Sequence, residues 1–284
     1  MTQGREARFP DDEPWLVPSV QEPRYSQSLE RGLGVLACFT PERPVLGVGD
    51  IAAELGMSSS TTHRYMITLA ALGYLEQDAS RRYRLALRVT DLGMSALSTT
   101  GLREHAHFYL EELRAQSSYT VSFAVLDGPE IVYIDRARSF RRGQAKIDLG
   151  LRPGSRRPAY CTAMGKVLLA YLPEHELTRT LGEMCLERQG PNTVMNKSVL
   201  RRELVQIHED GFAVNDQELA PGHHAMAVPV YAHSQEVVAA LGMAAHSSTI
   251  SLEAMVDHLL AHLMATADCI SARLGYRRDD ETAR

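Results

Sequence analysis

Cysteine, long apolar runs and excess positive charge are scarce in this chain of 284 residues, and each scarcity excludes a class of protein. The four cysteines are far apart and form no CxxC pair, which indicates reduced thiols and not a disulfide framework. No apolar run is long enough to cross a bilayer and no signal peptide is recognisable, so we expect a cytoplasmic protein without membrane contacts. The formal net charge of −5 excludes a polycation, but a basic footprint on one small domain remains compatible with it.

Motifs for nucleotide or metal chemistry are incomplete. Gly165-Lys166 ends a run that resembles GxxxxGK, but Tyr160 stands where its first glycine belongs, and Val167 replaces the residue that holds Mg²⁺. His258 and His262 are four apart but lack the glutamate of HExxH. We therefore expect no cofactor, no bound metal and no catalytic residue.

The segment Val48–Leu72 has the pattern of two short helices joined by a tight turn. Gly56 suits the left-handed conformation that ends the first helix, and Ser58 is a good N-cap for the second. The apolar face of the second helix comprises Thr62, Tyr65, Met66, Leu69 and Leu72. The opposite face is rich in hydroxyl and basic side chains, and we expect these to contact DNA: Ser59, Ser60, Thr61, His63 and Arg64. Such residues suit phosphates and base edges, so the segment predicts a helix-turn-helix whose second helix reads DNA.

A helix before this segment and a hairpin after it complete a winged domain. We expect the helix at Ser28–Phe39, capped by Ser28, and its inner face is predicted as Leu29, Leu33, Leu36 and Ala37. Strands are expected at Tyr74–Glu76 and Arg81–Leu85. Arg81 and Arg82 lie at the hairpin tip, where a wing contacts phosphates. The alternative is a hairpin whose charges are merely solvated.

Composition and periodicity divide the chain into five parts. We expect a flexible tail at 1–24, the winged helix-turn-helix domain at 25–86, a linker helix at 87–100, an α+β domain at 101–275 and a second tail at 276–284. In the α+β domain, helices flank a mainly antiparallel sheet of about six strands. These strands are expected at 120–126, 131–137, 145–149, 212–214, 225–231 and 236–245.

Two stretches of the α+β domain, taken together with the winged domain, carry a resemblance to a known family. They are Asp148–Pro173, DLGLRPGSRRPAYCTAMGKVLLAYLP, and Gly211–Tyr231, GFAVNDQELAPGHHAMAVPVY. From about Tyr25 to Leu274 the chain resembles the IclR family of bacterial transcriptional regulators, and within it the regulators of protocatechuate and β-ketoadipate catabolism. The resemblance implies a GAF-like domain that binds a small organic acid, and homodimers that commonly pair into homotetramers.

The resemblance also implies where the effector binds. The residues expected around it are Thr162, Ala163, Met164, Asn215, His223, Ala225, Gly242 and Ala244. Family members often have an acidic residue at position 215 and Cys or Ser at positions 225, 242 and 244, whereas this chain has an amide and three small apolar residues there. A site with fewer fixed donors and more room suits a bulkier, aromatic acid.

A carboxylate in this site needs a positive or donating group. The N-terminus of the helix that begins at Ala163 supplies free N–H groups and the positive end of a dipole. His223 or His224 could add a charge-assisted bond. Arg136 and Arg141 are further candidates, and a plain surface position is the alternative for both.

The sequence therefore favours an effector-responsive regulator that binds double-stranded operator DNA and controls aromatic-acid catabolic genes. A small-molecule sensor that acts through a protein partner is the alternative. Cys161 with His223, His224 and Asp216 could form a nucleophilic site, although nothing in their spacing supports it and an enzyme would not explain the winged domain. Zinc bound by Cys161 and the two histidines is a little more plausible.

Overall fold

The structure is a computed structural model that describes residues 25–99, 101–139 and 149–277. The tail expected at 1–24, Arg141, most of the strand expected at 145–149 and residues 278–284 lie outside this part. The chain divides into two compact units, Met1–Ser95 and Ala96–Arg284, and the division falls inside helix α4, Arg88–Thr99. No helix within the described ranges has the length and apolarity needed to span a membrane.

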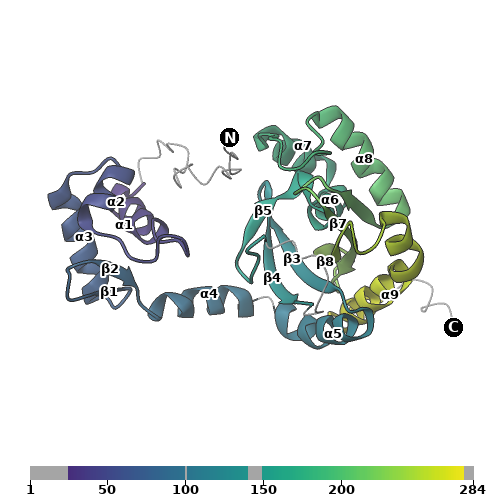
Figure 1. Ribbon diagram of the computed structural model, residues 1–284, viewed down its shortest axis with the longest axis horizontal. Helices are drawn as coiled ribbons and strands as arrows, with labels where there is room; N and C mark the ends of the chain where they lie inside the picture. Colours follow the sequence, from purple (N-terminus) through teal and green to yellow (C-terminus); the bar gives the residue numbers. More distant parts are fainter. Residues whose placement is uncertain (1–24, 100, 140–148, 278–284) are drawn as a thin grey trace, which may run out of the picture. The chain divides into compact units, whose positions relative to one another are not determined.

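The N-terminal unit consists of a helical core and a two-stranded hairpin (Figure 1). Its elements before α4 are α1 Gln27–Ala37, α2 Val48–Glu54, α3 Ser59–Ala71, β1 Leu75–Gln77 and β2 Tyr83–Leu85. The strands pair antiparallel with Leu75 opposite Leu85. Val35, Ile51 and Met66 are fully buried and join the three helices in one core. This is the expected winged helix-turn-helix.

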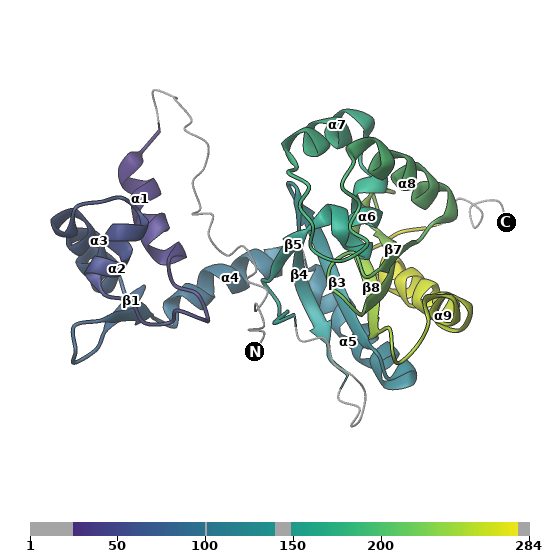
Figure 2. The same cartoon turned by 45° about the horizontal axis from the view of Figure 1, so that its top comes forward.

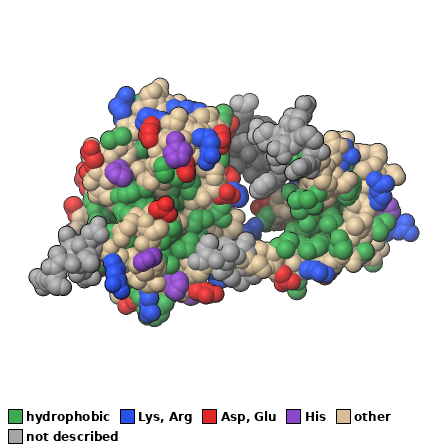
Figure 3. Space-filling view, turned by 180° about the vertical axis from the view of Figure 1, so that it is seen from behind, with side chains coloured by type: hydrophobic (Ala, Val, Ile, Leu, Met, Phe, Trp, Pro, Cys, Tyr) green, Lys and Arg blue, Asp and Glu red, His purple; other side chains and the backbone are tan. Residues whose placement is uncertain are grey.

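The inner face expected for the first helix is wrong at two positions. Leu29 and Leu33 are 64% and 57% exposed, whereas Val35 is fully buried. Ser26, and not Ser28, caps the helix, because its side chain accepts a hydrogen bond from the backbone N–H of Leu29. Helix α1 has apolar residues on two faces, and periodicity does not tell which face the other helices cover. Hydrophobic side chains accordingly gather on the surface of this unit (Figure 3).

The C-terminal unit is built on one antiparallel sheet with the strand order β5-β4-β3-β8-β7-β6 (Figures 1 and 2). Its strands are β3 Thr120–Asp127, β4 Glu130–Ala137, β5 Arg156–Pro158, β6 Ala213–Asp216, β7 His223–Tyr231 and β8 Val237–His246. Strand β5 is a correction, since the sequence predicts no strand there. Two arginines and an edge proline lack the alternating apolar pattern that reveals a strand.

Helices cover both faces of this sheet (Figure 2). Helices α5 (Leu102–Ser117) and α9 (Leu252–Arg273) pack on one face. On the other lie α6 (Ala163–Ala170), α7 (Glu174–Glu183) and α8 (Lys197–Asp210). The α5/α9 face is filled by large, fully buried side chains. The unit is therefore the expected α+β domain, with a separate apolar core on each face.

The central strands have small side chains on the face beneath α6. They are Ser122 and Ala124 of β3, Ala225 and Ala227 of β7, and Ala240, Gly242 and Ala244 of β8. Gly242 is opposite both Ser122 and Ala227, so these residues form one row across the sheet. Small side chains let α6 approach the sheet closely, and this face contains the residues expected around the effector.

Candidate functional site

Helix α3 presents its polar face because its apolar face is fixed to the core. Gly56 has a φ of 61°, the left-handed turn expected between α2 and α3. The Ser58 side chain caps α3 by accepting a hydrogen bond from the N–H of Thr61 at 3.2 Å. Thr62 and Met66 are fully buried. The residues predicted to contact DNA lie opposite them: Ser59, Ser60, His63 and Arg64 are exposed, and Thr61 is half-buried.

The wing tip is ordered by one carboxylate. Asp78 accepts hydrogen bonds from the N–H and hydroxyl of Ser80 and from the N–H of Arg82. These bonds stabilise the anion and lower the pKa of Asp78. Arg81 follows at a φ of 62° and is exposed. The side chain of Arg81 makes no hydrogen bond or ion pair within the described residues, so it is available to a phosphate.

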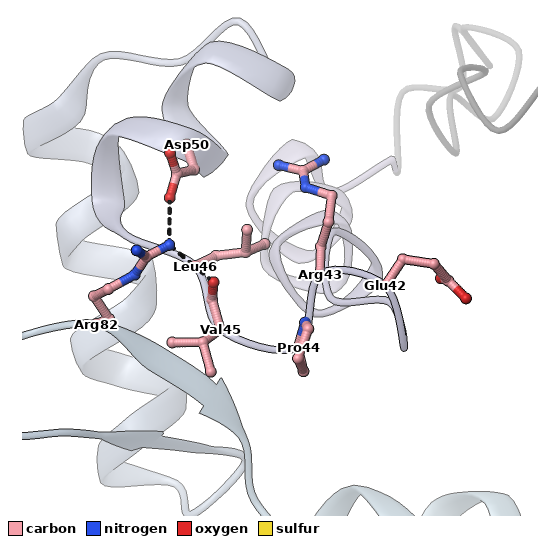
Figure 4. Close-up of a pocket in the computed structure, with 7 residues that line it drawn as sticks. All are labelled: Glu42, Arg43, Pro44, Val45, Leu46, Asp50 and Arg82. Atoms are coloured by element: carbon pink, nitrogen blue, oxygen red, sulfur yellow. Dashed lines mark hydrogen bonds and ion pairs between the residues drawn. The ribbon is translucent and has the colours of Figure 1, made fainter. Parts of the chain in front are cut away.

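Arg82 differs from Arg81 because the domain itself binds it. Its guanidinium donates to the carbonyl of Val45 at 3.0 Å and lies 3.4 Å from the carboxylate of Asp50 (Figure 4). These residues line an open cavity of about 370 Å³ beside the wing. Arg82 is still 51% exposed. A DNA phosphate at this position would therefore compete with Asp50 for the guanidinium.

The segment Ala159–Lys166 is shaped by close backbone approach. Thr162 caps α6, its hydroxyl accepting from the N–H of Gly165 at 3.1 Å. A Cβ on Gly165 would lie 2.3 Å from the carbonyl oxygen of Ala159, so only glycine fits. The cap and the close approach of Gly165 to Ala159 place Thr162, Ala163 and Met164 at the N-terminus of α6, where backbone N–H groups attract anions.

Lys166 is a buried cation that the sequence interpretation missed. Its side chain is fully buried, and Nζ donates to Glu203 and to Glu218, each at 2.5 Å. Burial raises the pKa of Glu218, although the ammonium group of Lys166 opposes the shift. The contacts join α6 to α8 and to the loop after β6. A lysine inside the apolar run AMGKVLLAY was the available signal.

Asn215 holds the neighbouring backbone in place. Its amide donates to the carbonyl of Cys161 at 2.6 Å, and its oxygen accepts from the N–H of Glu218 at 3.1 Å. Both ends of this buried side chain are thus engaged. Asn215 was predicted to contact the effector, and in the structure it links β6 to the segment that leads into α6.

The structure brings the other expected effector residues to one face. Ala225 is opposite both Asn215 and Ala244, and Gly242 lies one step along the same face. A Cβ on Gly242 would lie 2.7 Å from Cγ of Met164, so the methionine occupies the space that a larger residue would need. Met164 and Ala163 of α6 therefore lie over the small residues of β7 and β8.

The two adjacent histidines of β7 have different environments. His223 is 9% exposed, and its Nδ1 is buried without a hydrogen-bond partner among the described residues. Burial, with smaller contributions from His224 and Arg136, lowers the pKa of His223 to about 4. His224 lies 3.1 Å from both the Asp216 carboxylate and the Ile250 carbonyl. Successive residues of a strand face opposite ways, so the two rings do not converge on one metal ion.

Cys161 lacks the environment of a nucleophile. It is fully buried, and desolvation, with a smaller contribution from Glu218, raises the pKa of its thiol to about 12. The reactive form of cysteine is the thiolate, which this environment disfavours at neutral pH. Among residues 25–99, 101–139 and 149–277, no group of three histidine, cysteine or acidic side chains is placed to hold a metal ion.

Comparison with known proteins matches both units to one family. The profile described as the IclR helix-turn-helix domain matches residues 28–79, and that of the bacterial transcriptional regulator IclR C-terminal domain matches 94–272. The HTH-type transcriptional regulator XynR of Escherichia coli (strain K12) is 32% identical over 88% of this chain and 98% of its own. The Pca regulon regulatory protein of Pseudomonas putida is 32% identical over 87% and 83%.

A solved structure resembles this chain over most of its length. It is an IclR homologue from Microbacterium hydrocarbonoxydans in complex with 4-hydroxybenzoate, with a TM-score of 0.77 and 25% identity over 87% of this chain and 99% of that one. The helix-turn-helix and the ligand-binding domain define an effector-responsive, DNA-binding transcriptional regulator. More narrowly, the chain belongs to the IclR family, as its motifs suggested.

Proposed function

We propose that the protein controls genes of aromatic-acid catabolism and that its effector is an aromatic carboxylate. The observation that carries this proposal is the face beneath α6, where Ala225, Gly242 and Ala244 have small side chains and the flexible side chain of Met164 covers Gly242, so that a shift of Met164 would admit a flat, apolar body. The names of the Pseudomonas putida regulator and of the 4-hydroxybenzoate complex favour the same ligand class. Thr162, Ala163 and Met164 would lie against the acid, with Asn215 and His223 beside them.

Isothermal titration calorimetry with the full chain tests the effector. The panel is protocatechuate, 4-hydroxybenzoate, phthalate and 3-oxoadipate, with an electrophoretic shift of upstream DNA run with and without each acid. We expect at least one aromatic acid to bind and to change DNA affinity. Absence of binding by every aromatic acid would contradict the proposed ligand class, whereas absence of any DNA shift would favour the sensor that acts through a protein partner.

We infer that the protein is cytoplasmic and binds its operator as a homodimer. Two copies of α3 in successive major grooves require a near-palindromic operator. The exposed Leu29 and Leu33 of α1 favour an apolar contact between winged domains. A dimer of dimers through the C-terminal units is the larger assembly, and sedimentation at several protein concentrations distinguishes the two.

Arg64 is the residue of α3 best suited to read a base. Arg64→Ala should weaken operator binding by roughly 1–3 kcal/mol and relax selectivity at one position, because a bidentate contact to guanine is lost.

Arg81→Ala should lower the affinity for operator DNA and for random DNA alike and reduce the salt dependence of binding, because Arg81 would contact phosphate. Fluorescence anisotropy with both DNAs measures these effects. An Arg64 variant with unchanged affinity and selectivity would exclude the base-reading role.

A further inference from the structure

The wing hairpin is bonded to the chain that precedes α2 as well as closed by its own turn. Leu46 and Tyr83 exchange two backbone hydrogen bonds, of 2.9 and 2.8 Å, so the chain before α2 lies antiparallel beside the start of β2. Both side chains are buried in the core of the winged domain. The start of β2 is therefore fixed to the helices, and the turn between the strands is the part whose direction is still open.

Arg82 carries this connection into the turn. Its backbone N–H donates to the carboxylate of Asp78 at 2.9 Å, and its carbonyl accepts from the N–H of Asp78 at 2.8 Å, so the residue closes the turn. One nitrogen of its guanidinium donates to the carbonyl of Val45 at 3.0 Å and to the carboxylate of Asp50 at 3.4 Å (Figure 4). Arg82 thus joins the wing tip to the chain before α2 and to α2 itself.

Asp50 is held from its other side by the helix to which it belongs. The same oxygen that faces Arg82 accepts from the backbone N–H of Gly47, the N-cap residue of α2, at 2.8 Å. A carboxylate fixed by a helix cap has a defined direction, so its ion pair also defines where the guanidinium lies. Helix α2 shares its core with α3. The contact therefore fixes the wing tip relative to the helix that is expected to read DNA.

Arg81 is the residue whose direction this arrangement sets. Its φ is 62°, it is exposed, and its side chain has no partner within the described residues. Its position therefore depends on the turn that Arg82 closes. The guanidinium of Arg82, in contrast, already lies beside the carboxylate of Asp50, which reduces the net charge that it offers to a phosphate.

We propose that Asp50 and Arg82 form a latch that positions the wing, so that Arg81 and not Arg82 contacts the DNA phosphate. For Arg82 this role replaces the phosphate contact expected from the sequence, and the inference rests on the phosphate contact proposed for Arg81. Asp50 and Arg82 are then positioning residues, which act on DNA through Arg81. An exposed ion pair changes an equilibrium by a factor of about five at most, so the expected effects are modest.

Asp50→Asn tests the latch by the sign of its effect. The amide oxygen still accepts from the N–H of Gly47, so the cap of α2 is retained while the charge beside Arg82 is lost. The matched control is Glu76→Gln, because Glu76 pairs with Arg84 at 2.8 Å inside the hairpin and undergoes the same change of charge. If Arg82 contacted phosphate, both substitutions would strengthen DNA binding, because each removes a negative charge from the winged domain.

Fluorescence anisotropy of the full chain compares the upstream duplex that shifts in electrophoresis with a random duplex. We expect Asp50→Asn to bind the upstream duplex about twofold to fivefold more weakly than the wild type, because the wing tip is no longer held. Glu76→Gln should bind at least as tightly as the wild type. Tighter binding by both variants would overturn the latch and restore Arg82 as a phosphate contact.

A double-mutant cycle between positions 81 and 82 identifies the positioning role. Two independent phosphate contacts would give additive losses in log affinity, and each loss would reduce the salt slope by about one unit. If Arg82 acts through Arg81, then Arg81→Ala should cost at least threefold less affinity in the Arg82→Gln background than in the wild type. Additive losses would overturn the proposed role of Arg82.

Hydrogen–deuterium exchange of the full chain without DNA measures the latch independently of any DNA contact. The amides of residues 78–83 should exchange faster in Asp50→Asn and in Arg82→Gln than in the wild type, and Glu76→Gln should leave them unchanged. Unchanged exchange in both latch variants would overturn the latch. Faster exchange in both, combined with normal DNA binding by Arg81→Ala, would support the latch and reject the phosphate contact of Arg81.

Discussion

The two faces of the six-stranded sheet are built differently. Toward α5 and α9 the strands present large apolar side chains, among them Phe123, Met226 and Leu241, all fully buried. Toward α6 the same strands present alanine, glycine and serine, and the buried polar groups Lys166 and Asn215 lie on this side. Both faces carry an apolar core, but the face beneath α6 combines small strand side chains with buried polar contacts. Substitutions on the two faces should therefore separate stability from effector binding.

Lys166→Met should have the largest effect on the α6 face. It leaves the buried carboxylate of Glu218 without its cation, which costs about 3–5 kcal/mol for a broken buried pair. Thermal unfolding of the C-terminal unit measures the loss. Lys197→Met is the matched control, because Lys197 is exposed and donates only to the carbonyl of Gly182 in the described residues. Equal melting temperatures for the two variants would show that the buried pair adds nothing to stability.

Leu241→Ala tests the opposite face. Leu241 is fully buried beneath α5 and α9, so truncation should cost about 2–5 kcal/mol from lost burial and a cavity. The same variant, assayed well below its melting temperature, should bind effector with unchanged affinity. A large loss of effector affinity in the fully folded variant would mean that the two faces of the sheet are coupled, and that substitutions on them do not separate stability from binding.

Acid should destabilise the α6 face through His223. Its pKa is about 4 in the folded state and 6.5 without burial, so between these values the unfolded chain binds more protons. Stability should rise with pH across this window, by about 3 kcal/mol at most, and remain constant above it. His223→Gln removes this contribution, and the difference between its pH–stability curve and that of the wild type isolates His223. Parallel curves between pH 4 and 6.5 would contradict the assignment.

Gly242→Ala should have the smallest effect. The added Cβ would lie 2.7 Å from Met164, so the flexible methionine must move into the volume proposed for the effector beneath α6. Overpacking lowers the free energy of unfolding by about 1–3 kcal/mol, and movement of Met164 makes this loss smaller. We expect a modest fall in melting temperature and a larger fall in affinity for aromatic acids than for 3-oxoadipate, measured by calorimetry. Equal loss for both ligands would show that the space beside Gly242 does not select for size.

Much of the fold could be predicted because its signals are local. The segment Val48–Leu72 forms the two short helices expected there, and Ser58 caps α3 as predicted, because periodicity and capping depend on near neighbours. The prediction was wrong where a segment has two apolar faces, at Leu29 and Leu33, and it missed β5, where the strand has no alternating pattern.

The motifs indicated positions for the candidate site but not the contacts among them. They singled out Thr162–Met164 and Gly242, which the structure brings to one face, and their contact with an effector stays a prediction. Nothing in the spacing indicated that Arg82 donates to Val45, or that Asn215 has both ends of its amide engaged. Such partners come from distant segments, so they depend on how the strands pair.

The sequence by itself determined the class of protein, the helix-turn-helix and the small side chains at positions 225, 242 and 244. Only the tertiary structure decided which groups are buried together. Lys166 contacts Glu203 and Glu218, which follow it by 37 and 52 residues. Ser122 and Arg136 lie in one row with Gly242 because β3 pairs with both β4 and β8. Local patterns arise from hydrogen bonds between near neighbours, whereas burial and charge pairing depend on strands that meet only in the folded sheet.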